Sequence, residues 1–165
     1  MNKEITLTDL LDPEKFDLYK DELLAYFEKG GTWQDLLGYD DSLMDHNYAK
    51  AYNLLDSGDH IQAAQAFSFL TMVNPYNYDY WMGLGVAKQE LKSFEEAIVS
   101  FTTAEAIAPE NPIPHIQLAQ CFAALEAKEE ALNQLNQALD LSKKNPELKK
   151  FESLAKDLLQ ELQKK

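Results

Sequence analysis

The chain has 165 residues, a length suited to one domain or one short array of repeats. Its hydrophobic content of 45% predicts a folded chain with a core, and it excludes disorder as the dominant state. A net charge of −13, with 15 Lys and no Arg, argues against nucleic acid or an anionic membrane as the partner, because both would repel this surface.

Cysteine usage and hydropathy indicate a cytoplasmic protein. Cys121 is the single cysteine, so no internal disulfide can form and a reducing compartment fits. The first residues, MNKEITLTDLLDPEKF, lack the apolar run of a signal peptide. No run of 18 apolar residues occurs, so we expect no membrane span and no membrane insertion.

The N-terminal segment, residues 1–43, is expected to hold two helices. Asp12 and Pro13 open the first, which runs to about Glu28, and Thr32 caps a short second helix over WQDLLG. The apolar face of the first helix consists of Phe16, Leu23, Leu24 and Phe27. Two arrangements are open: this helix folds onto the next part of the chain, or it packs against another subunit in a homodimer.

The central part of the chain repeats with a period of 34 residues. The residues that recur at this spacing are Ala51, Gly85 and Ala119; Ala63, Ala97 and Ala131; Phe67, Phe101 and Leu135; and Pro75 and Pro109. Four registers agree on this single period, which is the period of the tetratricopeptide repeat, a pair of helices.

The pattern predicts three repeats, at 44–77, 78–111 and 112–145. Small residues allow the two antiparallel helices of a repeat to approach to roughly 8–10 Å, and large residues fill the space beside them. The expected fold class is all-α, a solenoid of three helix pairs with N-terminal helices and a C-terminal capping helix, forming one domain overall.

Residues 146–165 are predicted to form the capping helix, with Asn145 as its N-cap and Pro146 as its first residue. Its apolar side chains fall on one face and are Phe151, Leu154, Leu158, Leu159 and Leu162. A solenoid end needs such a cover. The alternative is a helix that binds a partner.

The sequence offers no catalytic constellation. GLG at 83–85 lies inside a predicted helix and is therefore no dinucleotide loop. The three histidines lack metal-ligand spacing, and Cys121 has no histidine placed to activate it. We expect neither an enzyme nor a metal, and no cofactor.

An uncharged surface runs along the first helices of the three repeats. Its residues are predicted to line a concave groove and are Tyr48, Tyr52, Leu55, Tyr78, Met82, Val86, Gln89, Ile116, Gln120 and Ala123. In a chain with 26% charged residues, such a surface suits an extended, mostly apolar peptide. The alternative is that these side chains pack on the N-terminal segment or on each other.

Three stretches of the chain resemble the class II chaperones of bacterial type III secretion, the LcrH/SycD group. YFEKGGTWQDLLGYDDS is similar to the family's N-terminal segment. AYNLLDSGDHIQAAQAFSFLTMVNPYNYDYWMGLG is similar to its first repeat and the start of its second, and LAQCF resembles its third.

This resemblance implies a non-enzymatic, ATP-independent chaperone that keeps a hydrophobic translocator protein soluble and ready for secretion. The groove would hold a linear segment of the translocator, and the N-terminal helix would form a dimer. The alternative function is a general tetratricopeptide-repeat scaffold for another cytoplasmic complex, because the repeat by itself is common to many binding proteins.

Overall fold

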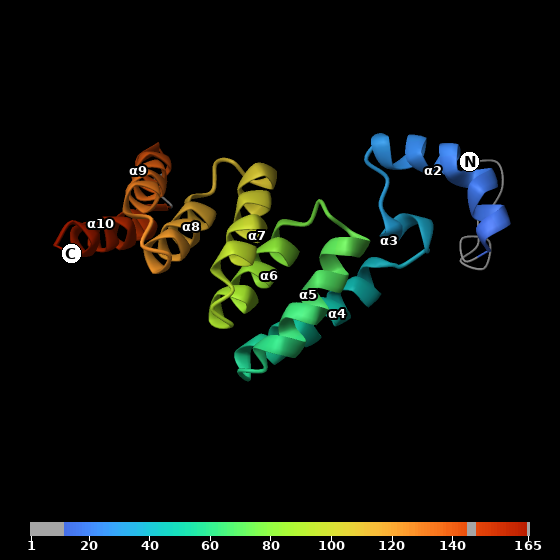
Figure 1. The fold of residues 1–165 in the computed structure, drawn as a ribbon, viewed down its shortest axis with the longest axis horizontal. Helices are drawn as coiled ribbons and strands as arrows, with labels where there is room; N and C mark the ends of the chain where they lie inside the picture. The colour runs from blue at the N-terminus through green and yellow to red at the C-terminus, as the bar shows by residue number, and fades with distance from the viewer. Residues whose placement is uncertain (1–11, 145–147, 165) are drawn as a thin grey trace.

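The computed structural model describes residues 12–144 and 148–164, which form helices joined by short turns and contain no strand. The elements are α2 (Pro13–Glu28), α3 (Trp33–Leu36), α4 (Asp41–Asp56), α5 (His60–Val73), α6 (Tyr78–Glu90), α7 (Phe94–Ile107), α8 (Pro112–Ala124), α9 (Lys128–Lys144) and α10 (Lys149–Lys164). Helices α4 to α9 form three successive pairs along an elongated molecule (Figure 1). The predicted all-α solenoid of helix pairs is confirmed.

The first helix pair begins earlier than the sequence indicated. Helix α4 starts at Asp41, ahead of the predicted repeat boundary at 44, because the Asp40 carboxylate accepts a hydrogen bond from the Leu43 amide at 2.8 Å and so caps the helix. At the other end of the solenoid, the predicted cap at Asn145 and Pro146 lies outside the described residues. The division into repeats and flanking segments remains a prediction.

An asparagine N-cap opens the first helix of both the second and the third pair. Asn77 accepts hydrogen bonds from the amides of Asp79 and Tyr80, and Asn111, which lies 34 residues later, accepts one from Ile113. Both asparagines have nearly the same extended backbone, with ψ of 115° and 121°. The period found in the sequence therefore corresponds to a repeated backbone geometry.

The turn inside each pair uses one residue with a left-handed backbone. These residues are Gly58 with φ of 84°, Lys92 with φ of 60° and Glu126 with φ of 60°, again at a spacing of 34. Only the first is a glycine, and the left-handed region costs a non-glycine residue roughly 1–2 kcal/mol. The second and third turns therefore carry backbone strain that the first does not.

Helix α6 is clamped between two aromatic rings. A Cβ atom on Gly83 would overlap the ring of Phe67 from α5, and a Cβ on Gly85 would overlap the ring of Phe101 from α7. Both rings are fully buried. Since only hydrogen fits at the two contact points, the glycines set how closely α6 packs on both neighbours.

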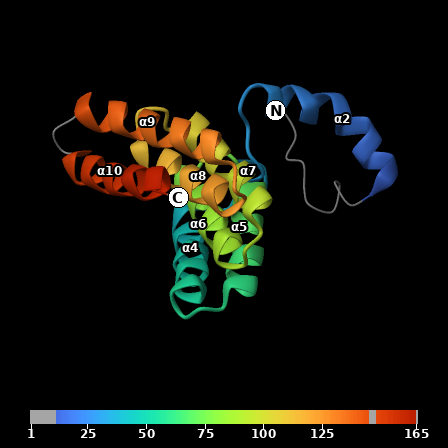
Figure 2. The ribbon, with the colours of Figure 1, turned by 60° about the vertical axis from the view of Figure 1, so that its left-hand side comes forward.

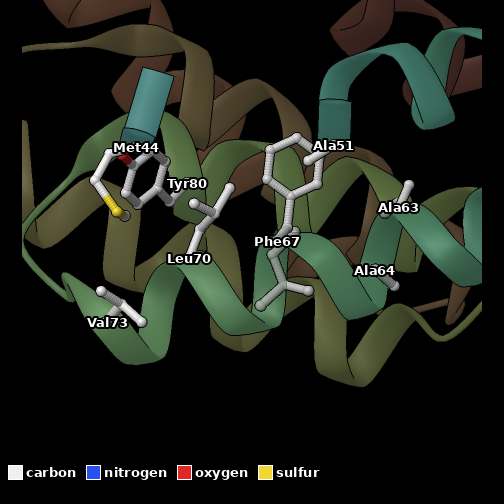
Figure 3. Packing of buried hydrophobic residues seen from close by; sticks show 10 residues of the cluster. Met44, Ala51, Ala63, Ala64, Phe67, Leu70, Val73 and Tyr80 are labelled. Atoms are coloured by element: carbon white, nitrogen blue, oxygen red, sulfur yellow. The ribbon is translucent and has the colours of Figure 1, made fainter. Parts of the chain in front are cut away.

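The core is divided among neighbouring pairs. Its first cluster joins α4, α5 and α6 and contains Met44, Ala51, Ala63, Ala64, Phe67, Leu70, Val73, Tyr80, Leu84 and Ala87. Figure 3 shows these side chains directed into the space between the helices. Because each cluster involves only adjacent elements, the stability of the array is the sum of contributions from neighbouring helices.

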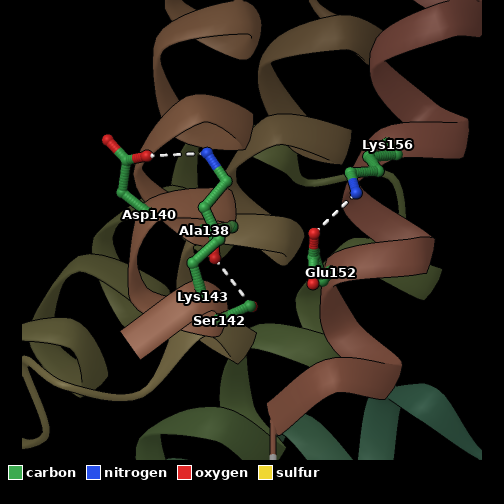
Figure 4. A network of polar contacts seen from close by, with 6 residues as sticks. All are labelled: Ala138, Asp140, Ser142, Lys143, Glu152 and Lys156. Carbon is green, nitrogen blue, oxygen red and sulfur yellow. Dashed lines mark hydrogen bonds and ion pairs between the residues drawn. The ribbon is translucent and has the colours of Figure 1, made fainter. Parts of the chain in front are cut away.

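Helix α10 covers the end of the array through apolar contacts. Phe151, Leu158, Leu159 and Leu162 pack on a cluster that includes Leu135 of α9 and Ile116 of α8. The polar contacts of this region in Figure 4 stay within single helices, such as Ser142 to Ala138 in α9 and Lys156 to Glu152 in α10. Leu154, which the sequence assigned to the same face, is 44% exposed.

The N-terminal helices are attached to the array at one point. The Gln34 side chain of α3 donates to Asp41 at 3.2 Å and accepts from Asn74 at 2.9 Å, and Trp33 and Tyr39 pack against the first core cluster. Helix α2 stands away from the helix pairs in both Figure 1 and Figure 2. The sequence left two arrangements open for this helix, packing onto the first repeat or packing against another subunit. In this structure α2 does not pack onto the first repeat.

Adding a methyl group at either glycine of α6 should destabilise the protein. Gly83→Ala and Gly85→Ala are each expected to lower the free energy of unfolding by about 1–3 kcal/mol, because the ring in the way must move inside a packed core. This loss should appear in urea denaturation even though alanine favours an exposed helix by about 1 kcal/mol. A variant as stable as the parent chain would show that α6 is not clamped in this way.

Glycine at the two strained turns should have the opposite effect. Lys92→Gly and Glu126→Gly are each expected to raise the free energy of unfolding by about 0.5–1 kcal/mol, since relief of strain exceeds the added entropy of the unfolded chain. Gly58→Ala, at the equivalent turn, is the matched control and should be destabilising. Urea midpoints that fall for both glycine variants would contradict the interpretation.

Candidate peptide-binding groove

The first helices of the three pairs lie next to one another and share one face. Two contacts connect them: the rings of Tyr48 in α4 and Tyr80 in α6 have centroids 5.8 Å apart, and Gln89 Nε2 in α6 donates to Gln120 Oε1 in α8 at 3.1 Å. We call the side of α4, α6 and α8 that carries the ten predicted groove residues the A-helix face.

The α4 part of this face is aromatic. Tyr48 is half-buried, with its ring 6.0 Å from that of Phe67 and 6.4 Å from that of Tyr52. It packs against the same core cluster as Trp33 and Tyr39, so the alternative interpretation, packing with the N-terminal segment, applies to Tyr48 in part. Tyr52 remains 52% exposed and is available for contact.

Three tyrosines near the joint between the first two pairs are held in the neutral form. Burial raises the pKa of Tyr48, of Tyr80 and of Tyr78, and the Asp79 carboxylate adds to the effect at each of them. The pKa of Tyr78 reaches about 12. An acidic neighbour therefore lies close to this aromatic group, yet the face itself carries no tyrosinate at neutral pH.

A hollow of about 250 Å³ lies where the turn end of the first pair meets α6. Its lining residues are Tyr52, Leu55, Asp56, His60, Val86 and Glu90, and we call it the turn-side hollow. Three of the predicted groove residues, Tyr52, Leu55 and Val86, are thus brought together. The other three lining residues were not among the predicted groove residues. Asp56 comes directly after the predicted residue Leu55, and Glu90 comes directly after the predicted residue Gln89.

The α6 part of the face is only partly open. Met82 and Val86 are half-buried and pack against the cluster that contains Phe101 and Leu118. The hydroxyl of Tyr78 accepts a hydrogen bond from Asn111 Nδ2 at 3.0 Å, which ties this ring to the loop before α8. Tyr78 therefore helps to hold two repeats together as well as bordering the face.

The α8 part differs most from the sequence-based expectation. Ile116 is only 3% exposed and lies in the cluster covered by α10, so it offers no surface to a partner. Gln120 and Ala123 line a second hollow of about 170 Å³. Its other lining residues are Ala119 of α8, Leu135 of α9, and Leu158, Glu161 and Leu162 of α10.

The part of α10 that borders this second hollow was missed as a site element. The apolar stripe with Leu158 and Leu162 was visible in the sequence, but it was assigned to capping alone. In the structure the same stripe caps the array and lines the second hollow, since its side chains cover Ile116 and also border the space beside Ala123. Periodicity shows that a helix face is apolar, but it does not show how far a neighbour covers that face.

The titratable groups elsewhere form no reactive arrangement in the described part of the chain. Cys121 is fully buried, and burial raises the pKa of its thiol to about 11. His115 is buried with Nδ1 2.7 Å from Gln134 Oε1, a contact between α8 and α9. Among residues 12–144 and 148–164, no cluster of His, Cys, Asp and Glu side chains is suited to hold a metal ion.

The apolar face of α2 is partly uncovered. Leu24 is 53% exposed and Phe16 39% exposed, whereas Leu23 is buried. The ring of Phe27 lies 4.9 Å from that of Trp33, which connects α2 to α3.

The helices of the described residues are all too short or too polar to cross a bilayer.

Comparison with known proteins places these features in context. A family model described as tetratricopeptide repeat matches residues 89–156. The chaperone protein SicA of Salmonella typhimurium is 32% identical over 93 residues, a match that spans 56% of this chain and 56% of SicA. The aligned region is therefore about half the length of that relative.

Solved structures share the fold over a larger part of the chain. A type III secretion complex from Aeromonas hydrophila aligns with a TM-score of 0.84 and 24% identity, covering 87% of this chain and 96% of the other. The Yersinia enterocolitica chaperone SycD, in complex with a peptide of the translocator YopD, aligns with a TM-score of 0.71 and 22% identity over 75% of this chain and 95% of SycD. The resemblance to class II type III secretion chaperones indicated by the sequence is confirmed.

Proposed function

We propose that this chain, which resembles the class II chaperones of type III secretion, is itself such a chaperone for a translocator protein. It binds one extended, mostly apolar segment of the translocator on the A-helix face and keeps the client soluble until secretion. The protein acts in the bacterial cytoplasm, without ATP and without catalysing a reaction.

The observation that carries this proposal is an uncharged face in a strongly acidic protein. The net charge is −13, but the A-helix face presents aromatic, aliphatic and amide groups from Tyr52 to Ala123. Hollows at both ends of the face provide recesses for side chains of a bound segment. Extended peptides bind through recesses of this kind, which take alternate side chains.

The solved relatives support the same interpretation. SycD has been crystallised with a peptide of a translocator, and its fold matches three quarters of this chain. The groups available on the A-helix face also match a holding function, since shielding an aggregation-prone segment requires burial of apolar surface and no chemical step.

Two aspartates on the A-helix face should abolish client binding. The Tyr52→Asp, Met82→Asp double variant is expected to lose at least about 100-fold in affinity, because the client would have to bury two charges without partners. The test is co-expression with a translocator protein of the same secretion system, followed by co-purification and titration with the purified client segment.

Val99→Asp is the matched control, because Val99 is 63% exposed on α7 and lies outside the A-helix face. It should bind the client as the parent chain does. Circular dichroism should show unchanged helicity for all variants. A translocator that stays insoluble and never co-purifies would favour the general scaffold instead, and full affinity in the double variant would place the site elsewhere.

Helix α2 is proposed as the dimerisation element of this chaperone. Its exposed side chains Phe16 and Leu24 lie on one side of a helix that stands away from the array. A second copy would cover that surface, and contact between two equivalent patches is the usual geometry of a homodimer.

Charges on α2 should therefore produce monomers. Phe16→Glu with Leu24→Glu uses the two exposed candidates and leaves the buried Leu23 unchanged. Sedimentation equilibrium should give a mass half that of the parent chain. Leu154→Glu on α10, which is comparably exposed, is the control and should leave the mass unchanged. A double variant with the parent mass would contradict the assignment.

A further inference from the structure

The turn-side hollow combines two kinds of lining. The ring of Tyr52 and the side chains of Leu55 and Val86 provide an apolar wall, and Asp56 and Glu90 add carboxylates from two different helices. His60 completes the lining from the start of α5. An apolar wall next to two acids is the environment that suits a long side chain with a positive end.

The polar groups of this hollow have no partners within the chain. Over residues 12–144 and 148–164, the side chains of Asp56 and Glu90 take part in no hydrogen bond and no ion pair. The Nδ1 atom of His60 is buried and has no hydrogen-bond partner in the same part of the chain. A buried ring nitrogen without a partner is unusual. Asp56 and Glu90 are exposed, so their carboxylates are free to bind a group that enters this space.

The equivalent place one repeat later is bridged by a hydrogen bond between two side chains. Leu55 and Val86 lie 34 residues before Gln89 and Gln120, and this later pair is joined by a hydrogen bond of 3.1 Å. The later counterpart of Asp56 is Glu90, and that of Glu90 is the apolar Ala124. The backbone of the two joints repeats, but the first joint has a recess with an acid on each side, whereas at the second joint an amide pair stands in place of Leu55 and Val86.

We propose that the turn-side hollow binds a lysine or arginine side chain of the client segment. The aliphatic stem lies against Tyr52, Leu55 and Val86, and the cationic group is held between the carboxylates of Asp56 and Glu90. The Nδ1 atom of His60, in a neutral imidazole, can accept one of its hydrogen bonds. This inference rests on the proposed function and adds to it the class of sequence that the chaperone selects.

The hollow therefore gives the groove a direction. The recess beside α10 is lined largely by apolar side chains with the single acid Glu161, whereas the turn-side hollow carries two acids. A client segment with a basic residue near one end and apolar residues along the rest would fit in one orientation only. Segments without the basic residue bind more weakly, because they forgo the charge-assisted contacts with Asp56 and Glu90 and leave the buried Nδ1 atom of His60 without a partner.

The test uses short overlapping synthetic peptides that cover a translocator protein of the same secretion system. Peptides retained by the full-length chaperone should share one basic residue at a constant distance from their apolar residues. Replacing that residue by Gln should weaken binding to the parent chain about tenfold. The same replacement should have no effect on binding to the Asp56→Asn, Glu90→Gln variant, which marks a direct interaction.

A matched control removes the same charge elsewhere. Glu110→Gln with Asp157→Asn neutralises two exposed acids outside the hollow and should keep the parent preference for the basic residue. Retention of peptides with no basic residue, or an unchanged affinity in the Asp56→Asn, Glu90→Gln variant, would overturn this inference alone. Retention of no peptide by the parent chain would overturn the proposed function and this inference with it.

Discussion

The contact of α6 with two aromatic rings is the constraint on which the rest of the structure depends. Gly83 and Gly85 are about 200° apart around the helix axis, so the rings of Phe67 and Phe101 pack on nearly opposite sides of α6. With those two directions taken, Leu84 turns into the first core cluster, and the side that carries Met82 and Val86 is directed to the A-helix face. The glycines therefore decide both the helix spacing and the placement of the binding surface.

The repeated backbone supports joints with different chemistry. At both joints an asparagine caps the next helix, yet the side chains between the first helices differ: Leu55 and Val86 at the first, and the hydrogen-bonded Gln89 and Gln120 at the second. The amide pair links α6 to α8 by a hydrogen bond. The apolar pair leaves a recess between α4 and α6. Specificity can thus vary from joint to joint without a change in fold.

Acidic residues border the A-helix face, but the tyrosine side chains of the face itself are not ionised. Burial, with a smaller contribution from the Asp79 carboxylate, raises the pKa of Tyr48, Tyr78 and Tyr80, and the hydroxyl of Tyr78 also accepts a hydrogen bond from Asn111. A segment that lies on this face meets apolar groups along most of its length. If the face binds a client as proposed, the negative field of the surrounding protein favours segments that carry positive charge near an apolar stretch and disfavours acidic ones.

The sequence by itself determined the helix pairs and the uncharged face, because the 34-residue period and the spacing of small residues are local properties of the chain. Tertiary structure alone decided how much of that face is open. Ile116 fits the pattern of a groove residue, yet α10 covers it, and the acids Asp56 and Glu90 acquire a shared recess only when α4 and α6 pack. The strained turns at Lys92 and Glu126 were likewise invisible, since neither residue signals a left-handed backbone. Burial depends on contacts between segments far apart in the chain, and no period within one segment encodes them.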